Sequence, residues 1–160
     1  MRNYFAYGSN MGPKQLGERC PGAVLVGTAV LPEHRVFVTR DGWASLRGEP
    51  GASVYGVVWQ LTDQDLAALD DYEDTAHELY RRETKHVKRL AQAESLDALV
   101  YVATADADGT PNRGYLETVI AAARHHGLPE AYIAELAHWL PPGGSSRARE
   151  TGGRPGPYGR

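Results

Sequence analysis

The first residues of the chain combine types that could bind a small anion or a carbonyl group. Residues 4–11 read Tyr-Phe-Ala-Tyr-Gly-Ser-Asn-Met, an apolar and aromatic run that stops at Gly8, Ser9 and Asn10. Aromatic residues at short spacing favour a strand, and Gly, Ser and Asn favour a sharp exit from it. Backbone N–H groups of such a turn can converge on a carboxylate or carbonyl oxygen. The pattern also fits a turn that only ends a strand, so both interpretations stay open.

A second candidate is the carboxyl group of Glu73, at the end of a predicted helix. Thr62 is a typical N-cap, and acidic residues follow it in the first turn, where the helix dipole favours them. Leu66, Leu69 and Glu73 stand at positions i, i+3 and i+7, which share one helix face. We therefore expect Glu73 to point toward the core.

The acidic neighbours of Glu73 bear on what its carboxyl group could do. Asp70, Asp71 and Asp74 fall on the face that we expect to point outward. Nearby like charge and partial burial both favour the protonated form of a carboxyl group. Such a group suits proton transfer near neutral pH. The alternative is an inward carboxylate that only caps the helix or forms a salt bridge.

Other reactive residue types lack the patterns that their chemistry would need. Ser9 is not within a Gly-x-Ser-x-Gly elbow, and no spacing ties any of the six histidines to it. Cys20 has no redox partner motif, which is typical of a spectator thiol. His125 and His126 precede a glycine, where cations suit a helix C-terminus. No spacing indicates a zinc site or a dinucleotide fingerprint, so we predict no metal site.

Composition and charge exclude several classes of protein. With 160 residues, a hydrophobic fraction of 42% and a net charge of −3, the chain suits one domain and not a nucleic-acid binder, which would carry a basic stripe. Its single cysteine allows no intramolecular disulfide. Signal-peptide and membrane-helix patterns are not found, so we expect a cytoplasmic protein with no membrane partner. From residue 141 Pro, Gly, Ser and Arg dominate, which predicts a domain over residues 1–140 and a disordered tail over 141–160.

The elements that must position these residues indicate an α+β fold. Strands and helices follow one another without strict alternation, which favours a small mixed β-barrel with flanking helices. We expect strand 35–39 to pair with strand 23–31 across a turn, a second turn at residues 48–51, and a bulge or close backbone approach at Gly56. Besides the opening strand and the helix after Thr62, we predict strands over residues 23–31, 35–39, 43–47, 53–61, 80–90 and 97–104, and helices over residues 13–19, 113–126 and 128–140.

Several segments, taken in order, resemble one family. Residues 4–11 are similar to the signature loop of the γ-glutamylcyclotransferase-like (AIG2-like) family. Residues 69–73, Leu-Asp-Asp-Tyr-Glu, resemble the segment that ends in the catalytic glutamate of that family. Further similar positions are Pro50-Gly51, residues 54–59 (Val-Tyr-Gly-Val-Val-Trp), Tyr80, Pro111, Tyr115 and residues 126–129 (His-Gly-Leu-Pro). The resemblance spans residues 1–140.

The resemblance implies a small mixed barrel and a reaction that needs no metal or organic cofactor. The α-amine of a γ-glutamyl amide attacks its own γ-carbonyl, which gives 5-oxoproline and a free amine or amino acid. Glu73 would be the general acid/base, and backbone N–H groups of the turn would hold the glutamyl oxygens. The resemblance assigns substrate binding to Tyr7, Gly8, Ser9, Asn10, Tyr80 and Tyr115.

One departure from the family pattern leaves the substrate open. Close relatives often have Gly after the glutamate, whereas this chain has Asp74, which bears on substrate preference. The substrate could be a γ-glutamyl amino acid, a γ-glutamylamine or a γ-glutamyl group on a biosynthetic intermediate, and the protein could be a monomer or a homodimer. A non-catalytic protein that binds a γ-glutamyl-like ligand, and a hydrolase of the γ-glutamyl bond, are the alternative functions.

Overall fold

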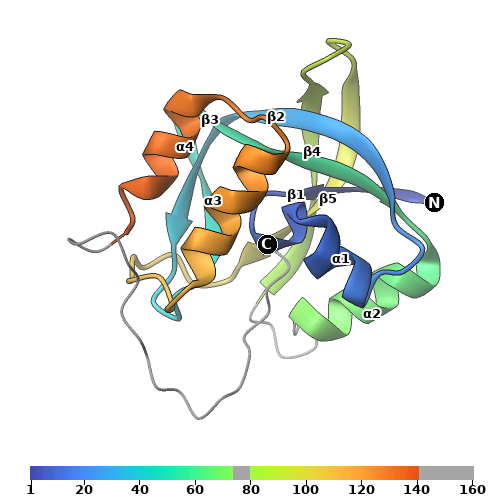
Figure 1. The fold of residues 1–160 in the computed structure, drawn as a ribbon, viewed down its shortest axis with the longest axis horizontal. Helices are drawn as coiled ribbons and strands as arrows, with labels where there is room; N and C mark the ends of the chain where they lie inside the picture. Colours follow the sequence, from blue (N-terminus) through green and yellow to red (C-terminus); the bar gives the residue numbers. More distant parts are fainter. Residues whose placement is uncertain (74–79, 141–160) are drawn as a thin grey trace.

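The centre of the molecule is a closed β-barrel (Figure 1). The computed structural model describes residues 1–73 and 80–140, so Asp74 and the tail predicted at 141–160 lie outside the described residues. The strand order is β1-β3-β2-β4-β5, and β5 closes the barrel against β1 through a parallel contact between Tyr4 and Leu99, whereas the other pairs are antiparallel. The expected small mixed barrel is confirmed. Its strands are β1 (Arg2–Ala6), β2 (Val24–Val38), β3 (Ala44–Leu61), β4 (Tyr80–Arg89) and β5 (Ser95–Ala103).

Two long strands replace four predicted short ones. Residues 23–31 and 35–39 do not pair with each other, because both belong to β2 and pair along its length with β3. The predicted turn at residues 48–51 lies inside β3. At both predicted turns the pairing of β2 with β3 continues, with one shift in register between Pro32 and His34. Glu33 lies at this shift with φ 61°, and its carboxylate accepts the N–H of Gly51 at 2.9 Å. Local turn residues therefore make a bulge here and not a hairpin.

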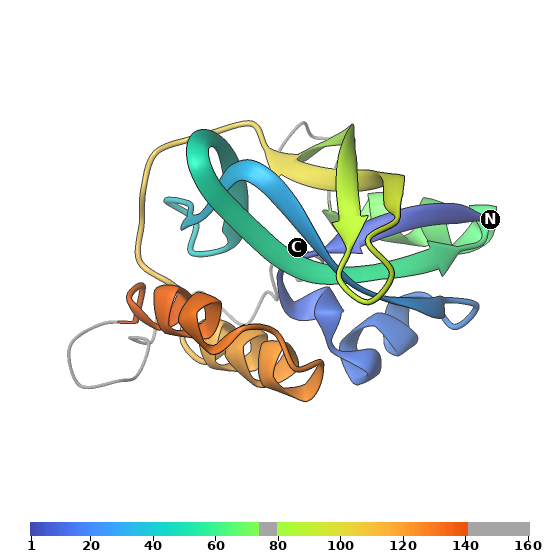
Figure 2. The same ribbon diagram turned by 90° about the horizontal axis from the view of Figure 1, so that it is seen from above.

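Helices cover one side and one end of the barrel. The helices are α1 (Pro13–Arg19), α2 (Asp63–Glu73), α3 (Tyr115–His125) and α4 (Glu130–Ala137), with a short 3₁₀ turn, η1 (Ser9–Met11), after β1. Figure 2 shows η1, α1, α3 and α4 along one side of the strands. α3 and α1 both contact η1, and α1 also contacts α2. All four predicted helices are confirmed, and the predicted N-cap is present, because Thr62 Oγ1 accepts the N–H of Asp65 at 3.0 Å.

Gly56 marks a close backbone approach, one of the two roles that we expected for it. A Cβ atom at this position would collide with the carbonyl oxygen of Ala6 and would lie 2.8 Å from Cζ of Phe5, both on β1. β1, which leads into the η1 turn, can therefore pack this closely on β3 only because residue 56 has no side chain.

Replacing Gly56 with Ala should destabilise the protein by about 1–3 kcal/mol, because β1 must shift to make room. The free energy of unfolding in urea measures the effect. Gly48→Ala is the matched control on the same strand, since nothing lies within 4 Å of its added Cβ, and it should change stability by no more than about 0.5 kcal/mol. Equal effects of the two substitutions would contradict the close-approach interpretation.

Candidate functional site

The turn after β1 is fully buried and closed by its own backbone. Tyr7, Gly8, Ser9 and Asn10 are all buried. The N–H of Met11 donates to Gly8 O at 3.1 Å, and the next N–H along the chain donates to Ser9 O at 3.0 Å. This closure does not use the N–H groups of Gly8, Ser9 and Asn10. Ser9 Oγ has no hydrogen-bond partner among the described residues.

The side chain of Asn10 anchors the turn to two neighbours. Its Nδ2 donates to the hydroxyl of Tyr4 at 3.2 Å, and its Oδ1 accepts a hydrogen bond from Nη1 of Arg19. Both ends of the amide are therefore held in one orientation. The hydroxyl of Tyr7 instead donates to the carbonyl of Tyr101 at 2.5 Å, which ties the turn to β5.

Glu73 is the last residue of α2, and it is completely buried. Leu66 and Leu69 on the same face are buried as well, so the predicted inward stripe is confirmed. Asp71 is exposed, as expected. The outward direction predicted for Asp70 is wrong, because its Oδ1 accepts a hydrogen bond from the hydroxyl of Tyr101 at 2.5 Å and lies 3.3 Å from Nε of Arg82. That pairing with β4 and β5 draws Asp70 toward the barrel.

Tyr4 and Tyr101 connect the turn with the end of α2. Their rings meet edge to face, with centroids 5.9 Å apart. Burial raises the pKa of the Tyr101 hydroxyl above its usual range, and its hydrogen bond to Asp70 and the charges of Asp70 and Glu73 raise it further. Tyr101 therefore stays protonated and donates. The Tyr4–Asn10 hydrogen bond, the Tyr4–Tyr101 ring contact and the Tyr101–Asp70 hydrogen bond therefore link the turn to the last part of α2. We call the turn, Tyr4, Tyr101 and the end of α2 with Glu73 the Glu73 cluster.

The register of β4 with β5 separates two faces of this pair of strands. Tyr80 lies opposite Ala103, and Arg82 lies opposite Tyr101. Because side chains alternate along a strand, Tyr80 and Tyr101 share one face, the face of Asp70. Tyr80 is buried there, only 4% exposed. The predicted Tyr80 thus lies on the same face of the barrel wall as the Tyr101–Asp70 pair.

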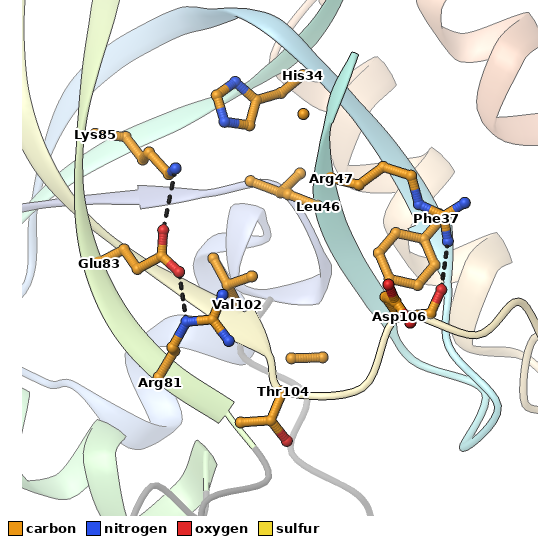
Figure 3. Close-up of a pocket in the computed structure, with 12 residues that line it drawn as sticks. His34, Phe37, Leu46, Arg47, Arg81, Glu83, Lys85, Val102, Thr104 and Asp106 are labelled. Atoms are coloured by element: carbon orange, nitrogen blue, oxygen red, sulfur yellow. Dashed lines mark hydrogen bonds and ion pairs between the residues drawn. The ribbon is translucent and has the colours of Figure 1, made fainter.

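The opposite face of β4 lines a pocket of about 360 Å³ (Figure 3). Arg81, Glu83 and Lys85 point into it, and Glu83 pairs with Arg81 at 2.5 Å and with Lys85 at 3.0 Å. On the other wall Arg47 pairs with Asp108 at 2.6 Å. None of the predicted site residues lines this pocket. Since the pocket holds no predicted site residue and the strand register turns it away from Tyr101, we place the candidate site at the Glu73 cluster.

Tyr115 has its described contacts at the loop between β2 and β3. Its hydroxyl lies 3.3 Å from the backbone nitrogen of Ala44 and accepts its N–H, and its ring meets that of Trp43 edge to face at 4.9 Å. The pocket-lining role of this hydroxyl stays a prediction. Sequence reasoning missed the residues that bind the turn and the helix end to each other, because the periodicity of one element carries no information about its side-chain partners in another. These residues are Tyr4, Arg19, Asp70, Tyr72 and Tyr101.

Other reactive groups are placed for packing. The thiol of Cys20 is buried and lies 3.5 Å from the carbonyl of Asp65, and burial, with the charge of Asp65, raises the pKa of this thiol to about 12.

Within residues 1–73 and 80–140, no group of three or more His, Cys, Asp or Glu side chains is placed to hold a metal ion. None of the helices in these ranges is long and apolar enough to span a membrane.

The chain is similar in sequence and in fold to proteins named gamma-glutamylcyclotransferase. Residues 53–136 match the model of the AIG2-like family. Proteins named gamma-glutamylcyclotransferase from Mus musculus and Homo sapiens are 27% and 28% identical over 144 residues, which cover 83% of this chain and 76% of each relative. A solved structure named gamma-glutamyl cyclotransferase has the same fold, with a TM-score of 0.82, 24% identity and coverage of 93% of this chain and 94% of that one. An uncharacterized human protein gives a TM-score of 0.81 at 25% identity, with the same two coverages.

His126 fastens α3 to the end of the η1 turn. Its Nε2 lies 2.6 Å from the carbonyl oxygen of Met11, so this nitrogen carries the hydrogen. Burial lowers the pKa of His126 below its usual value, against the opposing effect of this hydrogen bond, and the neighbouring His125 lowers it further. The ring therefore favours the neutral form, in contrast to the cation that we expected at this helix end.

We predict that the free energy of unfolding falls as pH drops below about 6.5, because the unfolded chain then binds a proton that the folded His126 resists. The loss should be roughly 0.5 kcal/mol, since the ring is only partly buried and solvent screens its charge. Urea unfolding at pH 7.0 and pH 5.5 measures it. His126→Gln retains a donor for Met11 O and should lose less stability over the same interval; an identical loss in both proteins would contradict the assignment.

Proposed function

Because this chain belongs to the AIG2-like family, we propose that it is a γ-glutamylcyclotransferase that converts a γ-glutamyl amide into 5-oxoproline. The observation that carries the proposal is the completely buried carboxyl group of Glu73 at the end of α2, a helix that Tyr101 and Tyr4 link to the turn at residues 7–10. Relatives that bear this name cover most of the chain. The substrate in this proposal is a small molecule.

The proposed reaction depends more on how the protein positions its substrate than on the reactivity of the protein's own side chains. The α-amine of the substrate attacks its own γ-carbonyl carbon, a C–N bond closes the five-membered ring, and the C–N bond to the leaving amine breaks. Since the nucleophile is tethered to the electrophile, the protein must mainly hold the cyclising conformer. Glu73 takes the proton from the attacking amine and returns it to the leaving nitrogen. One carboxyl group is enough for this balance, and no metal or organic cofactor enters it.

The turn supplies the binding site for the glutamyl oxygens in this proposal. Backbone N–H groups of Gly8, Ser9 and Asn10 are the donors, since the N–H groups of Met11 and Gly12 already close the turn. Each donor aimed at developing negative charge contributes about 3 kcal/mol at the transition state. The rigid anchoring of Asn10 would keep these donors in place before the substrate arrives.

The buried hydroxyl of Ser9 supports this role for the turn. It has no hydrogen-bond partner among the described residues, although it is only 2% exposed. An unsatisfied buried hydroxyl costs free energy in the protein without ligand. A bound γ-glutamyl group offers it a partner, so we assign Ser9 to substrate binding and not to nucleophilic attack.

Glu73→Gln should abolish the release of 5-oxoproline, at least a thousandfold, while the protein stays folded and still binds a γ-glutamyl compound. Mass spectrometry of the products from a panel of γ-glutamyl amino acids and amines measures this. Asp71→Asn is the matched control, because it removes an exposed carboxylate from the same helix and should keep full activity. Full activity of Glu73→Gln would refute the mechanism. Free glutamate as the product of the unsubstituted protein would identify a hydrolase, and binding without product would identify a binding protein.

Ser9→Ala should raise KM several-fold without lowering the free energy of unfolding, because it removes a buried hydroxyl that has no described partner. Ser45 gives the contrasting control. Its Oγ accepts the N–H of Ala103 at 2.9 Å, so Ser45→Ala leaves this partly buried N–H without its acceptor. That variant should lose about 1–3 kcal/mol of stability with KM unchanged. Steady-state kinetics and urea unfolding of both variants decide, and a Ser9→Ala protein with unchanged KM would contradict the binding role.

A further inference from the structure

The guanidinium group of Arg19 touches both halves of the candidate site. Arg19 ends α1 and is partly buried. Its Nη1 donates to Oδ1 of Asn10 in the turn, and its Nη2 donates to the hydroxyl of Tyr72 at 2.8 Å. Its Cζ also lies 4.0 Å from the centroid of the Tyr72 ring. One side chain thus contacts segments that are far apart in the sequence.

These two partners stand next to the groups that the proposed reaction uses. Asn10 belongs to the turn that would hold the glutamyl group, and Tyr72 immediately precedes Glu73 at the end of α2. Figure 1 shows α1 between η1 and α2, and α1 contacts both elements. Arg19 is therefore placed to set the distance between the turn and the catalytic carboxyl group.

Arginine suits this pair of contacts better than lysine does. Its planar guanidinium group presents several N–H donors in fixed directions, so two nitrogens can serve two partners at once while the flat face stacks on a ring. A lysine ammonium is a single point of charge on a flexible stem. It could bind either the Asn10 amide or the Tyr72 hydroxyl but would not hold both in one fixed geometry.

We propose that Arg19 is a positioning residue, which fixes the substrate-binding turn through Asn10 against the Glu73 end of α2 through Tyr72. This role rests on the proposed cyclotransferase function. Arg19 acts on the reaction through these two partners. An intramolecular reaction depends steeply on alignment, and a misplacement of about 1 Å costs roughly a hundredfold in rate.

The first test compares Arg19→Met and Arg19→Lys with wild type. We expect kcat to fall about a hundredfold in Arg19→Met and about tenfold in Arg19→Lys, with KM changed less than kcat, because alignment is lost more than binding. Arg35→Met is the matched control, since Arg35 forms exposed ion pairs with Glu49 and Glu135, and its kcat should stay within twofold of wild type. Circular dichroism and thermal unfolding verify that each variant is folded at the assay temperature.

A double-mutant cycle separates positioning from a general loss of structure. Tyr72→Phe keeps the ring and removes only the hydroxyl that accepts from Arg19, and it should lower kcat several-fold in the wild-type background. In the Arg19→Met background the same change should have no further effect, because the contact is already lost. Independent, multiplicative effects of the two substitutions would overturn the proposal.

The outcomes distinguish this role from the proposed function. A wild-type protein that forms no 5-oxoproline from any γ-glutamyl substrate would refute the function and the Arg19 role with it. If the wild-type protein is active and kcat of Arg19→Met is within threefold of the wild-type kcat, the Arg19 role alone is refuted. If Arg19→Met does not fold, Arg19→Lys replaces it; Tyr72→Phe should then lower kcat by a smaller factor than in wild type, and equal factors in the two backgrounds would overturn the proposal.

Discussion

The burial of Glu73 is the constraint on which the rest of the candidate site depends. Its carboxyl group is completely buried at the C-terminal end of α2, where the helix dipole disfavours negative charge. Burial also removes the water that would solvate the ionised form. Cationic and hydroxyl side chains gather around this helix end, namely Arg19, Tyr72, Arg82 and Tyr101. In the proposed reaction, these side chains surround a carboxyl group that would accept a proton from one nitrogen and return it to another.

The barrel supplies rigidity that loops alone could not give. Tyr101 stands on β5 and Tyr4 on β1, and the parallel contact at Tyr4 and Leu99 joins these strands where the barrel closes. Tyr4 binds the turn through a hydrogen bond with Asn10, and Tyr101 binds α2 through a hydrogen bond to Asp70. Both segments are therefore attached to the rigid strands of the barrel. Irregular backbone at the turn is thus held by side chains on regular strands, a common way to place functional loops.

The sequence predicted the catalytic candidate better than the contacts around it. The Thr62 cap and the spacing of Leu66, Leu69 and Glu73 are local signals, and they correctly predicted a buried carboxyl group at a helix end. The long strands β2 and β3 were missed because ladder pairing overrides the turn preference of proline and glycine. The direction of Asp70 and the role of Arg19 depend on partners 31 and 53 residues away, and helix periodicity carries no information about such contacts.

A cyclisation with its nucleophile tethered to its electrophile makes few chemical demands, so its rate depends on the residues that fix distances. Most of the polar contacts in the cluster involve side chains that do not enter the proposed proton transfer. Asn10 receives a hydrogen bond at one end of its amide and donates at the other, and Arg19 serves two elements with one guanidinium group. Each of these side chains loses conformational freedom, a cost that ordinary surface contacts rarely recover. Their placement around one small buried cluster supports the proposal that they align Glu73 with a substrate held at the turn.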